Sequence, residues 1–425
     1  MQRRLFLKQI ACTGVFAGGL TSLCTRAAPL LLKSSERPVI IIGGGFAGAM
    51  VARTLKRLSP RTKIVLIEKN ERFVPGPYVL QYVFGNHKNK DDITFGYDGL
   101  RAIGVQILHA EVQAIDPVRM EVSTSIGKFE FSKLVIATGI RPVMEEVAGL
   151  SASPQENYSP YYKDDIDRLR RKIQDFKGGN VVISIPPTAL PCPPAPYEYS
   201  LLWAEHIRKN NLKAKVVLLD SGSTPQPMPL SNYFKEELDD YRDVIEYVWG
   251  AGQVTEVDVN KKQVVTSSRE KYEYDVLSLI PQHDVSKFVK ELDLNSPGDL
   301  FAEVDPLTMR TRKYPDIYAL GDVARVPYGK SAYAANVCAT MCATSIAKSI
   351  GANVVPVNHV VRVSCFPFVN SQQALGMNVE YDVSVINEVV ELHTKAQVLA
   401  ASTSNFSERA MWSKHTLAHT FASGG

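Results

Sequence analysis

Two stretches of the sequence combine residue types and spacings that can carry chemistry. The first reads Gly43-Gly44-Gly45-Phe46-Ala47-Gly48, a G-x-G-x-x-G pattern between a short apolar strand and an apolar helical stretch. Glycines at these positions allow a tight turn and let a dinucleotide pyrophosphate approach backbone N–H groups at a helix start. Glu68 follows a second strand about twenty residues further on, where a carboxylate accepts ribose hydroxyls. Gly43, Gly45, Gly48 and Glu68 therefore predict a dinucleotide site, and the alternative is a tight turn without a ligand.

The second stretch, residues 181–198, begins as another buried strand and then enters a turn that contains no glycine. Prolines fill this turn and surround a single cysteine, Cys192. Proline has no N–H and fixes φ, so a pyrophosphate would find few donors here. We therefore predict that this second nucleotide-type unit has lost its nucleotide and gained a thiol.

The elements around both turns alternate between strands and helices, which predicts parallel sheets with right-handed crossovers. In the central part of the chain a helix (164–176) precedes a strand (181–185), a helix (199–209) and a strand (215–219). The predicted fold class is α/β, with two Rossmann-like dinucleotide-binding-type domains, the first interrupted by the second, and a smaller C-terminal α+β segment. The predicted bounds are 37–155 and 286–357 for the FAD domain, 156–285 for the central domain and 358–425 for the C-terminal domain.

Two further strand ends complete the predicted FAD site. One apolar strand ends in Ala137-Thr138-Gly139, which in two-dinucleotide flavoproteins marks where the chain leaves the FAD domain. A later strand ends in Gly321-Asp322, whose aspartate accepts a ribityl hydroxyl in FAD enzymes of this type. Lys330 and Tyr333 stand at the start of the next helix, and a cation there would stabilise an anionic reduced flavin. The alternative for Lys330 is an ordinary surface lysine.

The first 28 residues differ from the rest and resemble a twin-arginine export signal. They contain Arg3-Arg4, an uncharged stretch (9–25) and the small residues Ala27 and Ala28, near which we expect cleavage. The stretch is too short and too rich in glycine and threonine to span about 30 Å of hydrocarbon. Cleavage would leave 44 basic against 44 acidic side chains, so the mature chain is predicted to be near neutral and to have no nucleic-acid partner. The export signal predicts a periplasmic protein, and no transmembrane span is predicted in the mature chain.

Four cysteines would remain after cleavage, because Cys12 and Cys24 lie in the signal. Cys338 and Cys342 are four residues apart in an apolar helical stretch (334–350), which favours small buried side chains over a disulfide. Cys192 and Cys365 are then the candidate pair. A redox-active disulfide and a structural disulfide both remain possible for them. Glu198, six residues after Cys192, is a candidate for holding or moving protons, or a helix-start carboxylate.

With these residues in view, the sequence resembles the flavoprotein subunit of flavocytochrome c sulfide dehydrogenase, a relative of sulfide:quinone oxidoreductase. The resemblance extends from about Pro38 to Phe421, and its most specific part is Cys192-Pro193-Pro194-Ala195-Pro196-Tyr197-Glu198. The other motifs that carry it are Gly43 to Gly48, Glu68, Gly96 to Leu100, Gly321-Asp322, Lys330 to Asn336 and Cys365.

The resemblance implies a periplasmic heterodimer that oxidises sulfide with FAD and a Cys192–Cys365 redox disulfide, with Glu198 as the active-site glutamate. It also implies that electrons pass to a c-type, dihaem cytochrome subunit. This chain has no C-x-x-C-H motif, so any haem belongs to a partner. Well-known family members attach FAD through a cysteine after the second strand, whereas residues 72–80 contain none, which predicts non-covalent FAD. No metal site is predicted.

Two alternatives remain beside this hypothesis. One is a membrane-associated sulfide:quinone oxidoreductase, although the sequence after Ser402 lacks two clean amphipathic helices for lying on a bilayer. The other is an exported, non-catalytic flavin-binding protein whose disulfide is only structural. Quinone reduction without a cytochrome would indicate the first, and a flavin that sulfide leaves oxidised would indicate the second.

Overall fold

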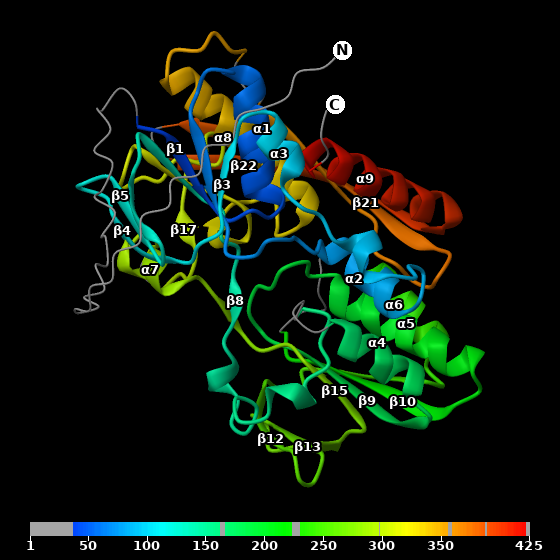
Figure 1. Ribbon diagram of the computed structural model, residues 1–425. Coiled ribbons are helices and arrows are strands. Elements are labelled where there is room, and N and C mark those ends of the chain that lie inside the picture. The colour runs from blue at the N-terminus through cyan, green and yellow to red at the C-terminus, as the bar shows by residue number, and fades with distance from the viewer. Residues whose placement is uncertain are drawn as a thin grey trace, which may run out of the picture. The chain divides into compact units, whose positions relative to one another are not determined.

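The computed structural model describes residues 37–161, 166–222, 230–296, 298–355, 359–386 and 389–421, and the expected export signal with Cys12 and Cys24 lies outside them. The described residues form two parallel sheets with helices, smaller antiparallel sheets, and a C-terminal antiparallel sheet followed by a helix (Figure 1). The predicted α/β class, with two dinucleotide-binding-type domains and a C-terminal α+β segment, is confirmed.

The first parallel sheet has the strand order β18–β7–β1–β2–β3 and carries the glycine-rich turn. Its strands are β1 (Val39–Ile42), β2 (Ile64–Ile67), β3 (Gln106–Leu108), β7 (Lys133–Ile136) and β18 (Ile317–Ala319). β1 and β2 are apolar along their whole length and β7 is apolar after Lys133, as expected for a parallel sheet covered on both faces. Because β18 follows the central region in sequence, two separate stretches of chain build this sheet.

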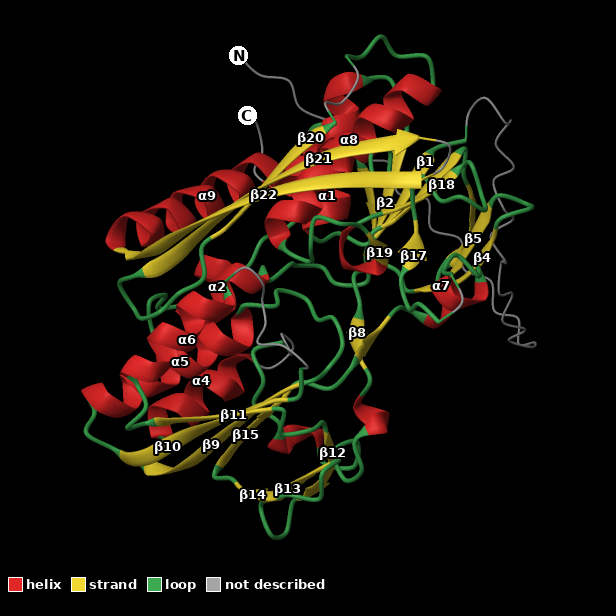
Figure 2. Cartoon of the chain, turned by 180° about the vertical axis from the view of Figure 1, so that it is seen from behind, coloured by secondary structure: helices red, strands yellow, loops and turns green. Residues whose placement is uncertain are grey.

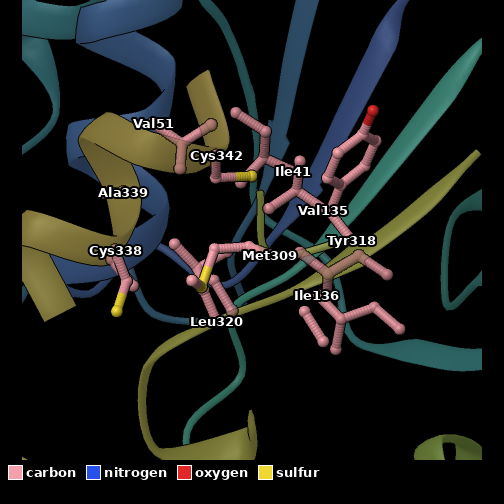
Figure 3. Close-up of a cluster of buried hydrophobic side chains, with 14 of the residues drawn as sticks. Ile41, Val51, Val135, Ile136, Met309, Tyr318, Leu320, Cys338, Ala339 and Cys342 are labelled. Atoms are coloured by element: carbon pink, nitrogen blue, oxygen red, sulfur yellow. The ribbon is translucent and has the colours of Figure 1, made fainter. Parts of the chain in front are cut away.

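Helices α1 (Phe46–Leu58) and α8 (Ala332–Ser349) pack together against this sheet. Figure 3 shows Val51 of α1 and Cys342 of α8 close to Ile41 of β1, with Val135 of β7 in the same cluster and Cys338 one turn earlier on α8. Both cysteines are buried and free, so the prediction of small packed side chains on one helix is confirmed. Burial raises the pKa of the Cys338 thiol to about 12 and raises that of Cys342 as well, which favours the protonated form of both thiols.

Smaller elements surround the first sheet. One small sheet is antiparallel and consists of β4 (Val112–Asp116), β5 (Glu121–Thr124) and β6 (Gly127–Glu130). The other is a parallel pair of β17 (Ala302–Glu303) and β19 (Ala324–Arg325). The short helices are α2 (Gly76–Val83), α3 (Asp98–Ala102) and α7 (Lys287–Glu291), with 3-10 turns at Lys90–Ile93, Met144–Glu146, Pro154–Glu156 and Gly321–Val323.

The second parallel sheet has the order β11–β10–β9–β15 and carries the proline-rich turn. Its strands are β9 (Gly178–Ile185), β10 (Lys213–Asp220), β11 (Ile245–Trp249) and β15 (Val276–Leu279). One face of this sheet carries the helices α4 (Ile166–Asp175), α5 (Ala195–Lys209) and α6 (Ser231–Asp240), and Val181 and Ile183 pack toward them. The other face carries β12 (Val254–Asp258), β13 (Gln263–Thr266) and β14 (Lys271–Glu273), and Val182 packs toward these strands. Figure 2 shows these two layers on opposite faces of the sheet. Alternate residues of a strand point to opposite faces of its sheet, so β9 contributes side chains to a hydrophobic core on each face.

The chain leaves the first sheet and returns to it through two short strands that pair with each other. These are β8 (Arg141–Pro142) and β16 (His283–Asp284), which run antiparallel. The outgoing and returning segments therefore lie side by side (Figure 1).

The C-terminal region is more regular than the sequence suggested. A short strand at 359–364 was expected, and it is β20 (Val360–Cys365). It is followed by a long antiparallel hairpin of β21 (Ala374–Ile386) and β22 (Val389–Ser402), and by the single helix α9 (Thr403–Phe421), which packs on β21 and α1 (Figure 2). Among the described residues, none of the helices is both long and apolar enough to cross a bilayer.

Candidate active site

The glycine-rich turn between β1 and α1 is built so that larger residues cannot replace two of its glycines. Gly43 has a φ of +100°, and a Cβ there would lie 2.3 Å from the carbonyl oxygen of Ala137. A Cβ on Gly48 would lie 1.9 Å from the carbonyl oxygen of Gly43. Gly45 differs, because the nearest atom to its added Cβ would be 3.7 Å away, on Phe73. The protein leaves the space beside Gly45 open, as a bound pyrophosphate would require.

Glu68 reaches this turn from the end of β2. One carboxylate oxygen accepts a hydrogen bond from the backbone N–H of Gly44 at 2.7 Å, and the other accepts one from the N–H of Asn70 at 2.8 Å. Helix α1 begins at Phe46, and its N-cap residue, Gly45, makes no side-chain cap hydrogen bond. A helix start without a cap and beside an open glycine suits an anionic ligand.

Further predicted cofactor residues come from three other segments. Ala137, Thr138 and Gly139 follow β7, and the Ala137 carbonyl adjoins Gly43. Gly321 has a φ of +74°, and a Cβ on it would lie 3.2 Å from the Ala47 side chain at the start of α1. The Gly321-Asp322 turn and the glycine-rich turn are therefore neighbours, although they are far apart in the sequence.

Lys330 is turned into the protein and is not the ordinary surface lysine that the sequence left as an alternative. Its ammonium donates to the backbone carbonyls of Asp322 at 2.6 Å and Ala324 at 3.2 Å, and lies 3.6 Å from the centre of the Phe301 ring. Burial lowers the pKa of Lys330 to about 8, with the Asp322 carboxylate acting in the opposite direction. The amine thus fixes the chain around the predicted flavin-binding turn.

Tyr333 lies at the start of α8 and stacks on Trp412 of α9, with ring centroids 5.4 Å apart. Both rings line an open groove of about 270 Å³ between α1, α8 and α9. Trp412 in turn approaches Phe46 of the glycine-rich turn, with a centroid distance of 6.5 Å. Tyr333 is therefore connected with the glycine-rich turn through Trp412.

Gly45→Ala tests whether a ligand fills the open space beside this turn. The added methyl meets no protein atom closer than 3.7 Å, so we expect a melting temperature within about 2 °C of the parent. We expect FAD affinity to fall by about tenfold or more, because the methyl keeps a pyrophosphate from the backbone. FAD binding to the apoprotein, followed by flavin fluorescence, measures this. Gly48→Ala should instead lower both stability and binding, and unchanged FAD affinity in Gly45→Ala would exclude the site.

Cys192 lies in the turn between β9 and α5, in an unusual backbone conformation. Its φ is +52°, in the left-handed region that non-glycine residues rarely adopt. Its N–H donates to the Lys330 carbonyl at 3.0 Å, and its carbonyl accepts from the N–H of Ala195 at 3.0 Å and from the Tyr161 hydroxyl at 2.9 Å. The proline-rich turn is thereby tied to the segment that carries Lys330.

Helix α5 begins at Ala195, four residues before the expected start, and this places Glu198 in its first turn. Glu198 is 2% exposed, and its carboxylate accepts from the Arg409 guanidinium at 2.7 Å. Arg409 also donates to the carbonyl of Phe366 at 2.8 Å and to that of Pro77 at 3.2 Å. Because Phe366 follows Cys365 directly, one arginine links the Cys365 segment to the helix that follows Cys192.

Cys192 and Cys365 are both free thiols and lie close enough to influence each other electrostatically. Burial raises the pKa of Cys192 well above its ordinary value, and the charges of Glu198 and Cys365 raise it further, while Arg409 acts in the opposite direction. Burial and Glu198 raise the pKa of Cys365 to about 12, again against Arg409. The structure thus brings together the three predicted catalytic residues, and the raised pKa values favour the protonated form of both free thiols.

Sequence reasoning missed Arg409 and Tyr161. Arg409 is 9% exposed in a helix that gave no local sign of a partner 211 residues away. Buried arginine is rare unless it is paired, but burial in this mixed-polarity segment could not be read from the sequence. Tyr161 precedes a charged helix, and nothing in its neighbours marks it as a contact of Cys192.

Glu198→Gln tests the electrostatic effect of the carboxylate on both thiols. Removing its negative charge should lower the pKa of Cys192 and Cys365, so more thiolate is present at pH 8 and iodoacetamide alkylates the reduced protein roughly three- to tenfold faster. Mass spectrometry of the labelled peptides measures each rate. Glu205→Gln, on the same helix but bonded to Ser371, is the matched control. Equal rates in the parent and in Glu198→Gln would contradict this assignment.

The chain has two parallel sheets of the dinucleotide-binding type. The first carries a glycine-rich turn, and the second carries a proline-rich turn with a cysteine. This combination defines a flavoprotein of the two-dinucleotide-binding-domain class. Residues 37–184 match the pyridine nucleotide-disulphide oxidoreductase family, and residues 167–281 match the central region of the sulfide dehydrogenase [flavocytochrome c] flavoprotein chain. The chain belongs to the pyridine nucleotide-disulphide oxidoreductase superfamily, which confirms the predicted relationship.

Relatives with known names agree with this placement. The mitochondrial sulfide:quinone oxidoreductase of Dictyostelium discoideum is 26% identical over 306 residues, which cover 70% of this chain and 67% of that protein. The sulfide-quinone reductase of Aquifex aeolicus is 28% identical over 190 residues, 44% of this chain and 43% of that protein. The solved structure of the Aquifex aeolicus sulfide:quinone oxidoreductase has the same fold, with a TM-score of 0.71, 18% identity and coverage of 91% and 92%.

Membership of this superfamily implies FAD as the cofactor, and the residues present fit it. The open side of Gly45, the uncapped start of α1 and the Glu68 carboxylate would hold the adenosine diphosphate part. The Gly321-Asp322 turn and Lys330 would hold the remainder. The chain is accordingly a flavin-dependent oxidoreductase.

Proposed function

We propose that this protein oxidises sulfide through Cys192 and Cys365 and passes the electrons by way of FAD to a c-type cytochrome subunit. The observation that carries the proposal is the cluster of both cysteines with Glu198 and Arg409, tied to the flavin-binding segment through the bond from Cys192 N–H to the Lys330 carbonyl. The match of residues 167–281 to the central region of flavocytochrome c sulfide dehydrogenase supports the substrate and the acceptor.

The proposed chemistry starts from the disulfide form of the pair. Hydrosulfide attacks one sulfur, the bond between Cys192 and Cys365 breaks, and a persulfide forms on one cysteine while the other leaves as a thiolate. FAD, when bound, supplies a two-electron acceptor that can release electrons one at a time. Return of the thiolate to the persulfide-bearing cysteine would by itself only expel hydrosulfide again. To close the disulfide with release of sulfur at the zero oxidation level, the thiolate and the persulfide together must give up two electrons and one proton, and bound FAD would accept the two electrons. Over one cycle, HS⁻ and one proton give sulfur at the zero oxidation level and a flavin reduced by two electrons.

The protein's own residues govern the charge in this cycle. Arg409 lies within bonding distance of Glu198 and lowers the pKa of both thiols, so it stabilises whichever cysteine leaves as a thiolate. Glu198 raises the same pKa values and therefore favours return of the proton. Together they form a buried ion pair beside the reacting sulfurs, which suits proton transfer without bulk water.

Anaerobic titration with sulfide tests the reaction. We expect the visible flavin absorbance to bleach with about one equivalent of sulfide per FAD, as two-electron reduction requires. A flavin that stays oxidised while dithionite reduces it would refute the enzyme and favour a non-catalytic flavin-binding protein. Acid denaturation should release free FAD, since residues 72–80 contain no cysteine for covalent attachment.

Quinone is the second candidate acceptor, because the named relatives include sulfide:quinone oxidoreductases. Sulfide-reduced protein should be offered decylubiquinone and, separately, a soluble c-type cytochrome. Faster reoxidation by the cytochrome supports our proposal, and efficient reoxidation by the quinone alone supports the relatives' acceptor.

We further propose export to the periplasm through residues 1–28. Twin-arginine-dependent processing of the precursor in cells tests this proposal.

A further inference from the structure

The backbone of Cys192 is held where an L-amino acid is rarely found. Its φ of +52° belongs to the left-handed region, in which a Cβ crowds the following carbonyl. Such conformations persist when the surroundings over-determine them, and they concentrate where geometry serves function. Cys192 is the one cysteine among the described residues with this conformation.

Three hydrogen bonds hold this residue at both of its peptide groups. The N–H donates to the Lys330 carbonyl at 3.0 Å, and the carbonyl accepts from Ala195 N–H at 3.0 Å. The third bond, from the Tyr161 hydroxyl at 2.9 Å, is the only one of the three that comes from a side chain. It can therefore be removed without changing the backbone sequence of the turn.

Tyr161 is well placed to donate this bond under all ordinary conditions. Its ring lies 5.9 Å from that of His283 in β16, so it is packed where the chain returns from the central domain. Burial raises the pKa of Tyr161 well above its ordinary value, and the nearby Cys192, Glu198 and Asp322 raise it further. The hydroxyl therefore stays protonated and can act as a donor.

We propose that Tyr161 is a positioning residue: with the Lys330 carbonyl it clamps the Cys192 backbone in the left-handed conformation and so sets the Cys192 sulfur for disulfide formation with Cys365. This inference rests on the proposed function and adds a residue to it. The Cys192 backbone already has this conformation while its thiol is free, so disulfide formation need not move the Cys192 backbone. Without the Tyr161 hydroxyl, the Cys192 backbone of the reduced protein can adopt a commoner conformation. Disulfide formation must then restore the left-handed conformation, which makes it less favourable.

The clamp predicts a change in the thiol–disulfide equilibrium of Tyr161→Phe. Holoprotein is equilibrated with glutathione, so that oxidised glutathione takes two electrons and two protons from the dithiol as the disulfide forms. We expect the equilibrium constant for disulfide formation to fall about three- to tenfold, and a tenfold fall corresponds to about 30 mV toward a more positive potential. Tyr158→Phe removes a hydroxyl from the same segment while its ring stays under Arg168, and should leave the constant unchanged.

Other measurements separate the clamp from a general loss of structure. FAD content and the melting temperature of Tyr161→Phe should stay close to those of Tyr158→Phe, while the potential moves only in Tyr161→Phe. An unchanged potential, an equal shift in both variants, or failure of the parent to form a Cys192–Cys365 disulfide overturns the clamp. Bleaching of the parent flavin by sulfide is measured in a separate experiment. If the potential shifts as expected but sulfide does not bleach the flavin, the proposed function is contradicted and the role of Tyr161 is still supported.

Discussion

Cys192→Ser is expected to lower the rate of flavin reduction by sulfide by about a thousandfold or more, because serine can form neither the disulfide nor the persulfide. Cys365→Ser should cost a similar amount, since removing either member of a pair that acts as a unit removes the whole step. Stopped-flow absorbance after mixing with sulfide under anaerobic conditions measures both. The flavin should still be reduced by dithionite in each variant, which shows that the cofactor remains bound.

Cys338→Ala supplies the matched control for this result. Cys338 is 1% exposed in the core of Figure 3, and neither Cys192 nor Cys365 is among the groups that shift its pKa. Its replacement should cost about 1 kcal/mol in the free energy of unfolding and leave the sulfide rate within about twofold. A Cys192→Ser protein that bleached at the parental rate would exclude the disulfide mechanism, whatever the behaviour of the control.

Arg409→Met is expected to lower the free energy of unfolding by about 3–5 kcal/mol, because it leaves the Glu198 carboxylate buried without its partner. It also removes the bonds to the carbonyls of Phe366 and Pro77, which are backbone acceptors near the site. Methionine keeps much of the packing on Phe368, over which the guanidinium lies at 3.5 Å. Urea unfolding at neutral pH measures the loss.

Lys128→Met is the corresponding control at an exposed pair. Its side chain is 57% exposed and bonds Glu121 at 2.8 Å, and exposed pairs contribute less than about 1 kcal/mol. The double variant Arg409→Met with Glu198→Gln should recover part of the stability lost in Arg409→Met, since the orphaned charge is then removed. Equal losses in Arg409→Met and Lys128→Met would mean that the Glu198–Arg409 pair is not a buried structural element.

The sequence was informative wherever a signal was local. The glycine-rich turn, the apolar strands and Glu68 are close in sequence, and each follows from steric or hydrophobic rules that act over a few residues. At Gly43 and Gly48 the expected tight turn leaves no room for a Cβ, because backbone atoms approach closely, whereas Gly45 has open space beside it. The burial of Cys338 and Cys342 was also predictable, because four-residue spacing places both on one helix face.

The sequence did not predict features that depend on contacts between distant residues or on exposed strands. Strand β22 is exposed along most of its length, so its sequence shows little of the alternation that marks a half-buried strand, and the long hairpin was not anticipated. Glu198 and Arg409 meet only because α9 folds back over the molecule, and no local pattern encodes that meeting. The left-handed Cys192 likewise depends on Lys330 and Tyr161, which are distant in sequence.

The pairing of β8 with β16 brings the two ends of the central domain together. An insertion whose ends are adjacent interrupts its host at one place, much as a loop does, and leaves the surrounding fold intact. A change in the turn after β9, from one that binds a nucleotide to one that carries a cysteine, would then leave the strands of the flavin-binding host in place. The paired strands thus let one architecture carry either kind of turn.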